Sequence, residues 1–166
     1  PEPVGLTADI AAALDRLLAR LTVHLAARGE GVRRLRLTLR RVDRQATSLT
    51  VGLARPSRDP GLIADLFARP LGEVEAGFGI DALRLEALDC EPLVPRQHRG
   101  HLAARAEAEA RQSAAGGEAF ATLLAKLGNR LGFDRLERYL PADSHIPARA
   151  FTAASAAHAA PPAHWP

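Results

Sequence analysis

Cysteine and lysine are nearly absent from this sequence, each occurring once in 166 residues, as Cys90 and Lys126. A single cysteine excludes an internal disulfide. Long hydrophobic runs are also missing, because no apolar stretch approaches the roughly 20 residues that a helix needs to span a bilayer. Residues 1–5 do not follow the basic, apolar and small-residue order of a secretory signal. We therefore expect a cytoplasmic protein that makes no membrane contact.

The positive charge of the chain is carried almost entirely by arginine. Lysine and arginine together number 22, and the formal net charge is +3. Arginine richness beside so much alanine is equally well explained by genomic composition, so the placement of the arginines matters more than their number. The planar arginine fork matches phosphate oxygens. A stripe of arginine on one sheet face therefore indicates nucleic acid better than overall charge does.

Residues 32–60 predict the framework of the chain, a β-hairpin followed by the start of a helix. Leucine alternates with arginine or threonine over 34–40, and after a turn at 43–46 a second alternation of apolar and small residues runs over 49–54. Successive strand residues point to opposite faces of a sheet. The leucines must therefore be covered by the rest of the chain, while the arginines face water or an anionic partner.

Two helices are predicted to cover the apolar face of this hairpin. Apolar residues at helical spacing indicate a helix over 10–28, and Asp59 followed by Pro60 is typical of the cap and first turn of another. A strand over 80–88 follows, and residues 1–5 have the pattern of the end of a first strand. This order predicts an α+β fold, a split βαβ sheet with two helices on one face and the other face open.

The predicted domain covers 1–92, and the rest of the chain is expected to be less ordered and to have a different composition. Residues 93–116 contain prolines and then an alanine-, arginine- and glutamate-rich run without an apolar stripe, so we predict a linker that is helical only transiently. Residues 117–150 are predicted to form a small interaction module with an amphipathic helix over 118–131 and a short strand. The remainder, 151–166, is rich in alanine and proline and is predicted to be disordered.

Four short segments carry a resemblance to a known family. They are GVRRLRL at 31–37, ARPSRDP at 54–60, GIDALRLE at 79–86 and SHIP at 144–147. In this order they resemble ImuB-type proteins, non-catalytic relatives of the Y-family translesion DNA polymerases. The first three are similar to the little-finger domain, whose split βαβ fold agrees with the pattern above. The last is similar to a feature downstream of that domain that separates ImuB-type proteins from ordinary Y-family polymerases.

The resemblance implies a DNA-binding accessory role in error-prone translesion synthesis and DNA repair. In that family the little finger grips DNA through its open sheet face, and the metal-binding carboxylates belong to a palm domain upstream of these residues. The implied partners are primer-template DNA, an ImuA-type protein, an error-prone replicative polymerase and the sliding clamp. A clamp-binding peptide of the Gln-Leu-x-Leu-Phe kind is expected between the two modules. Gln97 is the only glutamine in a comparable place, and residues 98–102 depart from the pattern.

The candidate site residues fall into two sets. The predicted DNA contacts are the arginines on or beside the open face: Arg34, Arg36, Arg40, Arg84, Arg55 and Arg58. The predicted partner contacts come from the C-terminal module: Phe120, Leu123, Leu124, Leu127, His145, Ile146 and Pro147. We predict no catalytic residue, metal or cofactor, because no carboxylate pair has a plausible pocket and His98 and His101 lack two further regularly spaced ligands.

Two alternatives to the DNA-binding accessory role stay open. One is the little finger of a catalytically active translesion polymerase, whose activity would lie upstream of these residues. The other is a protein-protein adaptor without DNA binding, whose arginine face is only a solvated surface.

Overall fold

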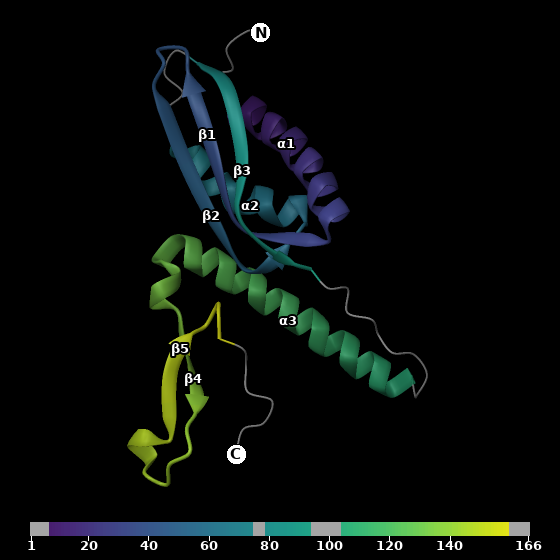
Figure 1. Cartoon of the computed structure of the whole chain (residues 1–166), viewed down its shortest axis with the longest axis vertical. Helices are drawn as coiled ribbons and strands as arrows, with labels where there is room; N and C mark the ends of the chain where they lie inside the picture. The colour runs from purple at the N-terminus through teal and green to yellow at the C-terminus, as the bar shows by residue number, and fades with distance from the viewer. Residues whose placement is uncertain (1–6, 75–78, 94–103, 160–166) are drawn as a thin grey trace. The chain divides into compact units, whose positions relative to one another are not determined.

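The computed structural model describes the backbone of residues 7–74, 79–93 and 104–159, and the side chains of 8–74, 79–93 and 116–159. The chain forms two compact units, unit 1 over Pro1–Gly100 and unit 2 over His101–Pro166 (Figure 1). Each unit is described by itself. None of the helices in the described ranges has an apolar stretch of the length that a bilayer crossing requires.

The described part of unit 1 is an antiparallel sheet in the order β2-β1-β3, with two helices on one face (Figure 1). Its elements follow the chain as α1 (Thr7–Arg28), β1 (Glu30–Arg41), β2 (Ala46–Ser57), α2 (Pro60–Gly72) and β3 (Ile80–Pro92). The predicted α+β fold, with its hairpin and both helices on one face, is confirmed. The predicted first strand, residues 1–5, lies outside the described residues.

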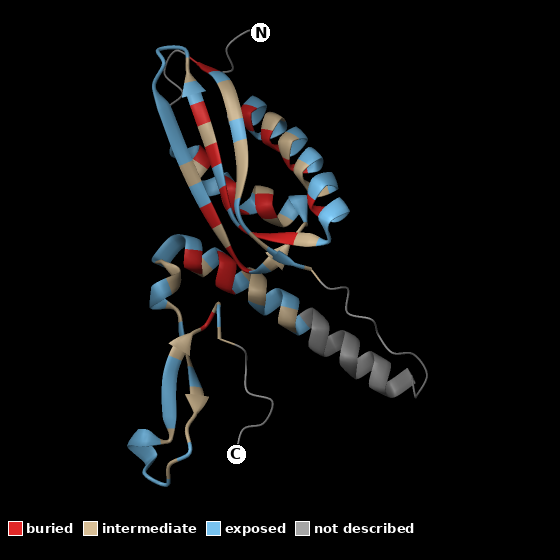
Figure 2. Cartoon of the chain, viewed as in Figure 1, coloured by how far each residue is buried: buried red, intermediate tan, exposed pale blue. Residues whose placement is uncertain are grey.

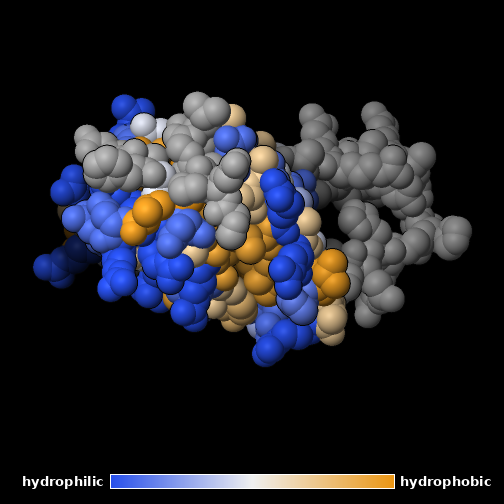
Figure 3. Space-filling model, turned by 90° about the horizontal axis from the view of Figure 1, so that it is seen from above, coloured by the Kyte–Doolittle hydropathy of each residue, from blue (hydrophilic) through white to orange (hydrophobic). Residues whose placement is uncertain are grey.

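The core of unit 1 lies between the two helices and the sheet. Leu35, Leu37 and Leu39 of the central strand have no exposed surface, and Figure 2 shows buried and exposed residues alternating along β1. The remaining buried apolar residues of the helices and strands are Ile10, Leu14, Leu18, Leu25, Val32, Val51, Leu53, Ala54, Ile63, Leu66, Phe67, Leu71 and Ile80. Seen from above, a band of hydrophobic residues is flanked by hydrophilic ones (Figure 3). Burial of the core side chains named above removes their apolar surface from water, which stabilises the fold by about 25 cal/mol per Å². This burial is the main force that holds the helices on the sheet.

Local sequence explains where the elements of unit 1 begin and end. The predicted cap of α2 is confirmed, since Oδ1 of Asp59 accepts a hydrogen bond from the backbone N–H of Gly61 at 2.9 Å. Gly31 of β1 lies so close to the end of β2 that an added Cβ would come within 2.9 Å of the backbone nitrogen of Ser57. The β1–β2 turn closes with Arg44 at a φ of 66°. Such a left-handed residue is common in short hairpin loops.

Unit 2 consists of a long helix, α3 (Ala104–Leu131), followed by a two-stranded hairpin of β4 (Glu137–Pro141) and β5 (Phe151–Ser155). Short 3-10 turns, η1 (Phe133–Arg135) and η2 (Pro147–Arg149), precede each strand. A Cβ built on Gly128 would overlap the ring of Phe133. Glycine at this position therefore lets the chain after α3 fold back onto the helix.

Two boundary predictions for this part of the chain are wrong. The helix begins at Ala104, inside the 93–116 segment for which a linker was predicted. Alanine, glutamate and arginine are strong helix formers, so an anchored helix can extend through them without an apolar stripe. Phe151–Ser155 forms β5 although 151–166 was predicted to be disordered. Its pairing with β4 comes from backbone hydrogen bonds, which need few apolar side chains.

Candidate nucleic-acid interface

The open face of the sheet, opposite α1 and α2, carries a row of arginines on its central strand. Arg34, Arg36 and Arg40 are exposed, whereas the leucines between them are buried. Arg84 of β3 is exposed and is the register partner of Thr38, so it lies on the same face. The structure thus brings together four of the six arginines predicted as DNA contacts. We call these four the open-face arginines.

Arg33 belongs to the same run of sequence but does not join this row. The register of β1 with both neighbours shifts between Val32 and Arg34, so Arg33 occupies a bulge. Its side chain is only 8% exposed, and its Nε lies 3.1 Å from a carboxylate oxygen of Glu91. Arg33 was not assigned a role from the sequence. The signal that could have found it is the Arg33-Arg34 pair, since strict alternation places one of two neighbours on the inner face.

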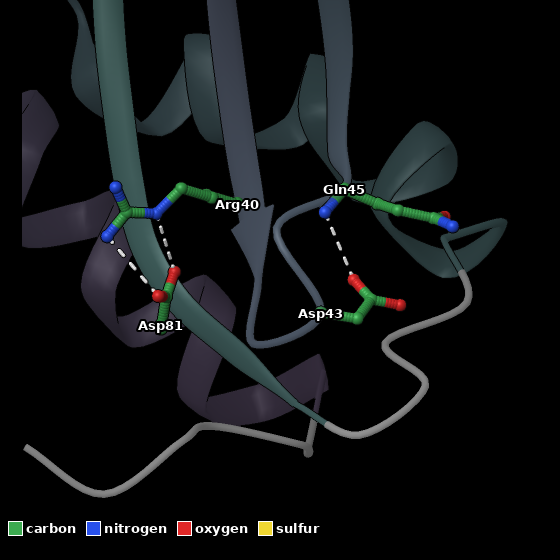
Figure 4. Close-up of polar contacts among 4 residues, drawn as sticks. All are labelled: Arg40, Asp43, Gln45 and Asp81. Atoms are coloured by element: carbon green, nitrogen blue, oxygen red, sulfur yellow. Dashed lines mark hydrogen bonds and ion pairs between the residues drawn. The ribbon is translucent and has the colours of Figure 1, made fainter.

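Acidic residues lie along the β3 side of the row. Arg40 donates from Nε and Nη2 to the two carboxylate oxygens of Asp81, at 3.0 and 3.2 Å (Figure 4). These hydrogen bonds, followed by the Coulombic attraction of Asp81, raise the pKa of the Arg40 guanidinium. Arg84 pairs with Glu86 at 3.0 Å. Two open-face arginines therefore already have an anionic partner.

Arg34 and Arg36 differ from the other two open-face arginines. Among the described residues, neither guanidinium forms an ion pair or hydrogen bond, and both side chains are exposed. Their β3 register partners are Asp89 and Glu86. Of the four open-face arginines, these two are therefore the most available to an external anion.

The β2 side of the row is uncharged and built from small residues. The register partners of Arg34, Arg36, Thr38 and Arg40 on β2 are Gly52, Thr50, Ser48 and Ala46. The hydroxyls of Thr38 and Ser48 lie 3.2 Å apart and form a hydrogen bond across the strands. Ser48 and Thr50 are exposed. Sequence reasoning found the alternation of this strand but gave no role to its hydroxyl groups.

Two predicted DNA contacts lie away from the regular part of the sheet. Arg55 is exposed but falls between Gly52 and Ser57, where β2 leaves its regular register with β1. Arg58 follows the end of β2 and is half-buried, and its carbonyl oxygen accepts a hydrogen bond from the hydroxyl of Thr22 at 3.2 Å. The structure does not bring either into the arginine row.

The predicted partner contacts of unit 2 are mostly exposed. Phe120, Leu123 and Ile146 are each about half exposed, at 48%, 51% and 54%. His145 and Pro147 are exposed, and Leu127 is half-buried. Leu124 is 8% exposed, less than the other predicted contacts. A helix with apolar residues on more than one side buries some of them and leaves others for solvent or a partner.

An exposed aromatic pair on the hairpin of unit 2 was missed from the sequence. The rings of Tyr139 and Phe151 meet edge to face with centroids 4.8 Å apart, and the residues are 61% and 47% exposed. Tyr139 pairs in register with Ala153, so Phe151 is its diagonal neighbour. The contact depends on a hairpin that was not predicted. No short-range pattern could therefore have revealed it.

Metal-ligating side chains do not gather in the part of the chain that the structure describes, where no group of three or more His, Cys, Asp or Glu is close enough to hold an ion. His98 and His101 lie outside the described residues. Cys90 is half-buried on β3, and burial is the first cause that raises the pKa of its thiol.

Comparison with known proteins assigns the chain to a family. The C-terminal domain of the impB/mucB/samB family matches residues 1–101. Two curated relatives, each called Protein ImuB and belonging to two strains of Caulobacter vibrioides, are 35% identical over 164 residues, which is 99% of this chain and 34% of each relative. The chain thus spans about a third of the length of the curated relatives that it matches. These matches confirm the resemblance to ImuB-type relatives of the Y-family polymerases. The chain therefore belongs to the impB/mucB/samB family, whose C-terminal domain corresponds to its residues 1–101.

Proposed function

We propose that unit 1 binds the phosphate backbone of DNA through its open face, as the DNA-binding accessory part of a protein that acts in error-prone translesion synthesis and DNA repair. The observation that carries the proposal is the arginine row, in which Arg34 and Arg36 are exposed and without an ion pair among the described residues. Membership in a Y-family-related family supports it.

The composition of the open face favours phosphate contacts over base reading. Sequence-specific contacts in the major groove typically come from a helix that presents Asn, Gln or Arg to base edges. In unit 1 both helices pack on the opposite face of the sheet (Figure 1). Arginine and hydroxyl side chains on a broad sheet reach backbone oxygens. We expect affinity with little dependence on base sequence, for a primer-template as for unrelated duplexes.

A salt titration of DNA binding tests the proposal. Contacts from all four open-face arginines imply a log–log slope of about −3.6, and contacts from Arg34 and Arg36 alone imply about −1.8. Affinity should therefore fall between about tenfold and about a hundredfold from ~50 to ~200 mM salt. Fluorescence anisotropy with a labelled primer-template gives the slope.

A matched pair of triple variants tests whether DNA binding depends on the open face or only on the total positive charge of the chain. Arg34→Ala/Arg36→Ala/Arg40→Ala removes three charges from the open face and should abolish most of the salt-dependent binding. The control removes three exposed arginines of α1 and α2, as Arg16→Ala/Arg20→Ala/Arg69→Ala, and should bind nearly as well as the parent. A flat salt response, or equal binding by both triple variants, would mean that the arginine face is a solvated surface.

We propose further that this chain contains no nucleotidyl-transfer centre of its own. Primer extension by the purified chain would contradict this. The runner-up function is the little finger of an active translesion polymerase. The presence or absence of metal-binding carboxylates in a palm domain of the full-length protein would decide between the two, because an active enzyme needs carboxylates to hold its metal ions.

We propose that unit 2 is a protein-interaction module, with an ImuA-type protein and an error-prone replicative polymerase as the first partners to test and the sliding clamp as a weaker candidate. The support is the exposed apolar set Phe120, Leu123 and Ile146, together with the predicted contacts His145 and Pro147. Exposed aromatic and aliphatic groups are typical anchors of protein interfaces.

Co-purification with each candidate partner tests this module. Phe120→Ser/Leu123→Ser should lose the partner while retaining DNA binding by unit 1. The control is Val23→Ser on α1, which removes an apolar residue of 67% exposure from the other unit and should leave partner binding unchanged. Unchanged capture of every partner by the Phe120/Leu123 variant would overturn the assignment.

A further inference from the structure

The two sides of the arginine row differ sharply in charge. β2, over Ala46–Ser57, contains no aspartate or glutamate. β3, over Ile80–Pro92, contains four acidic residues, Asp81, Glu86, Asp89 and Glu91, against one arginine, Arg84, which is paired with Glu86. Because β1 lies between these two strands, every arginine of its open face has β2 on one flank and β3 on the other (Figure 1).

This asymmetry holds at each exposed arginine of β1. Arg34 is flanked in register by Asp89 on β3 and by Gly52 on β2. Arg36 is flanked by Glu86 on β3 and by Thr50 on β2. Arg40 has Ala46 on its β2 side and is bound by both carboxylate oxygens of Asp81 on its β3 side.

A phosphate would meet very different conditions on the two flanks. Carboxylates repel it, and the like charge is felt most where the DNA and the protein exclude water from between them. On the β2 flank the side chains are small, so the backbone of a strand can approach the sheet. Ser48 and Thr50 carry hydroxyl groups, which donate hydrogen bonds to phosphate oxygens.

We propose that the phosphates of bound DNA lie over the β1–β2 half of the open face, where Ser48 and Thr50 join Arg34 and Arg36 as contacts, and that the acidic β3 half is turned away from the DNA backbone. This inference rests on the proposed DNA binding by unit 1. It identifies two hydroxyl residues as positioning contacts and assigns the β3 carboxylates the role of excluding the phosphates from one side of the row.

A charge swap across Arg36 tests the placement. The double variant Thr50→Glu/Glu86→Thr moves one carboxylate from the β3 flank of Arg36 to its β2 flank without changing the net charge or the composition. Neither position lies in the buried core, and a far-UV circular dichroism spectrum and melting temperature equal to those of the parent show that the fold is intact. Affinity for a labelled duplex is measured by anisotropy at several salt concentrations.

We expect the swap variant to bind about tenfold more weakly, with a salt slope smaller by about 0.9, because one phosphate contact is lost. The single variant Glu86→Thr should bind as well as the parent or better. A swap variant that binds as well as the parent, or more tightly, overturns the placement. In that case the salt-dependent binding of the parent still stands, whereas a parent that binds no DNA removes the proposed function itself.

A second variant tests the same placement without adding a charge. Ser48→Ala/Thr50→Val removes both hydroxyls from the β2 flank and should weaken binding several-fold, with a matched pair of hydroxyl losses on unit 2, Thr152→Val/Ser155→Ala, showing no effect. Equal affinity of the β2 variant and the parent would contradict the assigned contacts.

Discussion

Arg40 and Asp81 form a two-point ion pair on the open face, with Nε and Nη2 of the guanidinium donating to the two carboxylate oxygens at 3.0 and 3.2 Å. This fork-to-fork geometry is the one in which arginine also binds phosphate. An incoming phosphate must therefore displace Asp81. The free energy of the ion pair that Arg40 forms with the phosphate is then nearly offset by the loss of its ion pair with Asp81. Arg36 has no such partner among the described residues. The four open-face arginines are thus not equivalent.

The first prediction compares Arg36→Ala with Arg40→Ala. The Arg36 variant should lower the magnitude of the salt slope by about 0.9, the value expected for one phosphate contact. The Arg40 variant should lower it by less than half as much, because its side chain is held by Asp81. Anisotropy titrations over several salt concentrations give both slopes. The two variants share a strand and a face, so each serves as the control for the other.

Releasing Arg40 from Asp81 should remove this difference. In Asp81→Asn the carboxylate charge is gone, so affinity should rise and a subsequent Arg40→Ala change should then cost as much as Arg36→Ala does in the parent. Equal slopes for Arg36→Ala and Arg40→Ala in the parent, or no effect of Asp81→Asn, would show that the pair does not restrain Arg40.

The second prediction concerns the buried Arg33 side chain. Its partner Glu91 is 48% exposed, so the pair is partly screened by solvent. Removing a partner of a buried charge is still costly, and we expect Glu91→Gln to lower the free energy of unfolding by about 1 kcal/mol. Glu73→Gln is the control, because its pair with Arg69 is 65% and 66% exposed and should contribute less than about 0.5 kcal/mol. Urea unfolding followed by circular dichroism measures both; a cost for Glu91→Gln no larger than the control would contradict the prediction.

The sheet and its arginine row could be predicted from the sequence because they depend on local periodicity. Leucine at 35, 37 and 39 must face the core, and this alone places Arg34, Arg36 and Arg40 on the other side. The cap at Asp59 was accessible for the same reason, since its signal is contained in a few neighbouring residues.

The anionic partner of Arg40 was not accessible, because it depends on register. Asp81 lies 41 residues from Arg40, and their contact requires β3 to pair with β1 in one particular alignment. The bulge at Arg33 breaks the alternation by one residue and could not be placed without both neighbouring strands. In unit 2, β5 has weak local signals and is held by its pairing with β4.

The third prediction concerns the reactivity of Cys90. Burial first, and then the negative charge of Glu30, raise the pKa of this thiol above the ordinary value of 9.0. Since the thiolate is the reactive form, iodoacetamide should label Cys90 more slowly in the folded chain than in the urea-unfolded chain at the same pH. The rate profile of the folded chain should also be displaced to higher pH.

The raised pKa of Cys90 also makes the stability of the folded chain depend on pH. The folded state holds the proton more tightly than the unfolded state, so the contribution is present below the unfolded pKa and is lost as pH rises through the folded pKa. Cys90→Ala should therefore lose less stability than the parent at alkaline pH. Identical labelling profiles for folded and unfolded chains would contradict the raised pKa.

The last prediction uses two glycines of the same helix that differ only in their surroundings. A Cβ on Gly128 would overlap the ring of Phe133, whereas a Cβ on Gly116 would meet nothing within 4 Å. Alanine is the better helix former, so Gly116→Ala should stabilise unit 2 by about 0.5–1 kcal/mol. Gly128→Ala gains the same propensity but must displace a packed ring, and overpacking typically costs about 1–3 kcal/mol, so we expect a net loss. Hydrogen exchange of the β4 and β5 amides, which lie beyond Phe133, should quicken in Gly128→Ala and slow or stay unchanged in Gly116→Ala. If Phe133→Ala restores the stability of Gly128→Ala, the ring contact is the cause of the loss. If both glycine variants instead stabilise the unit alike, the chain after α3 does not pack on the helix at Gly128.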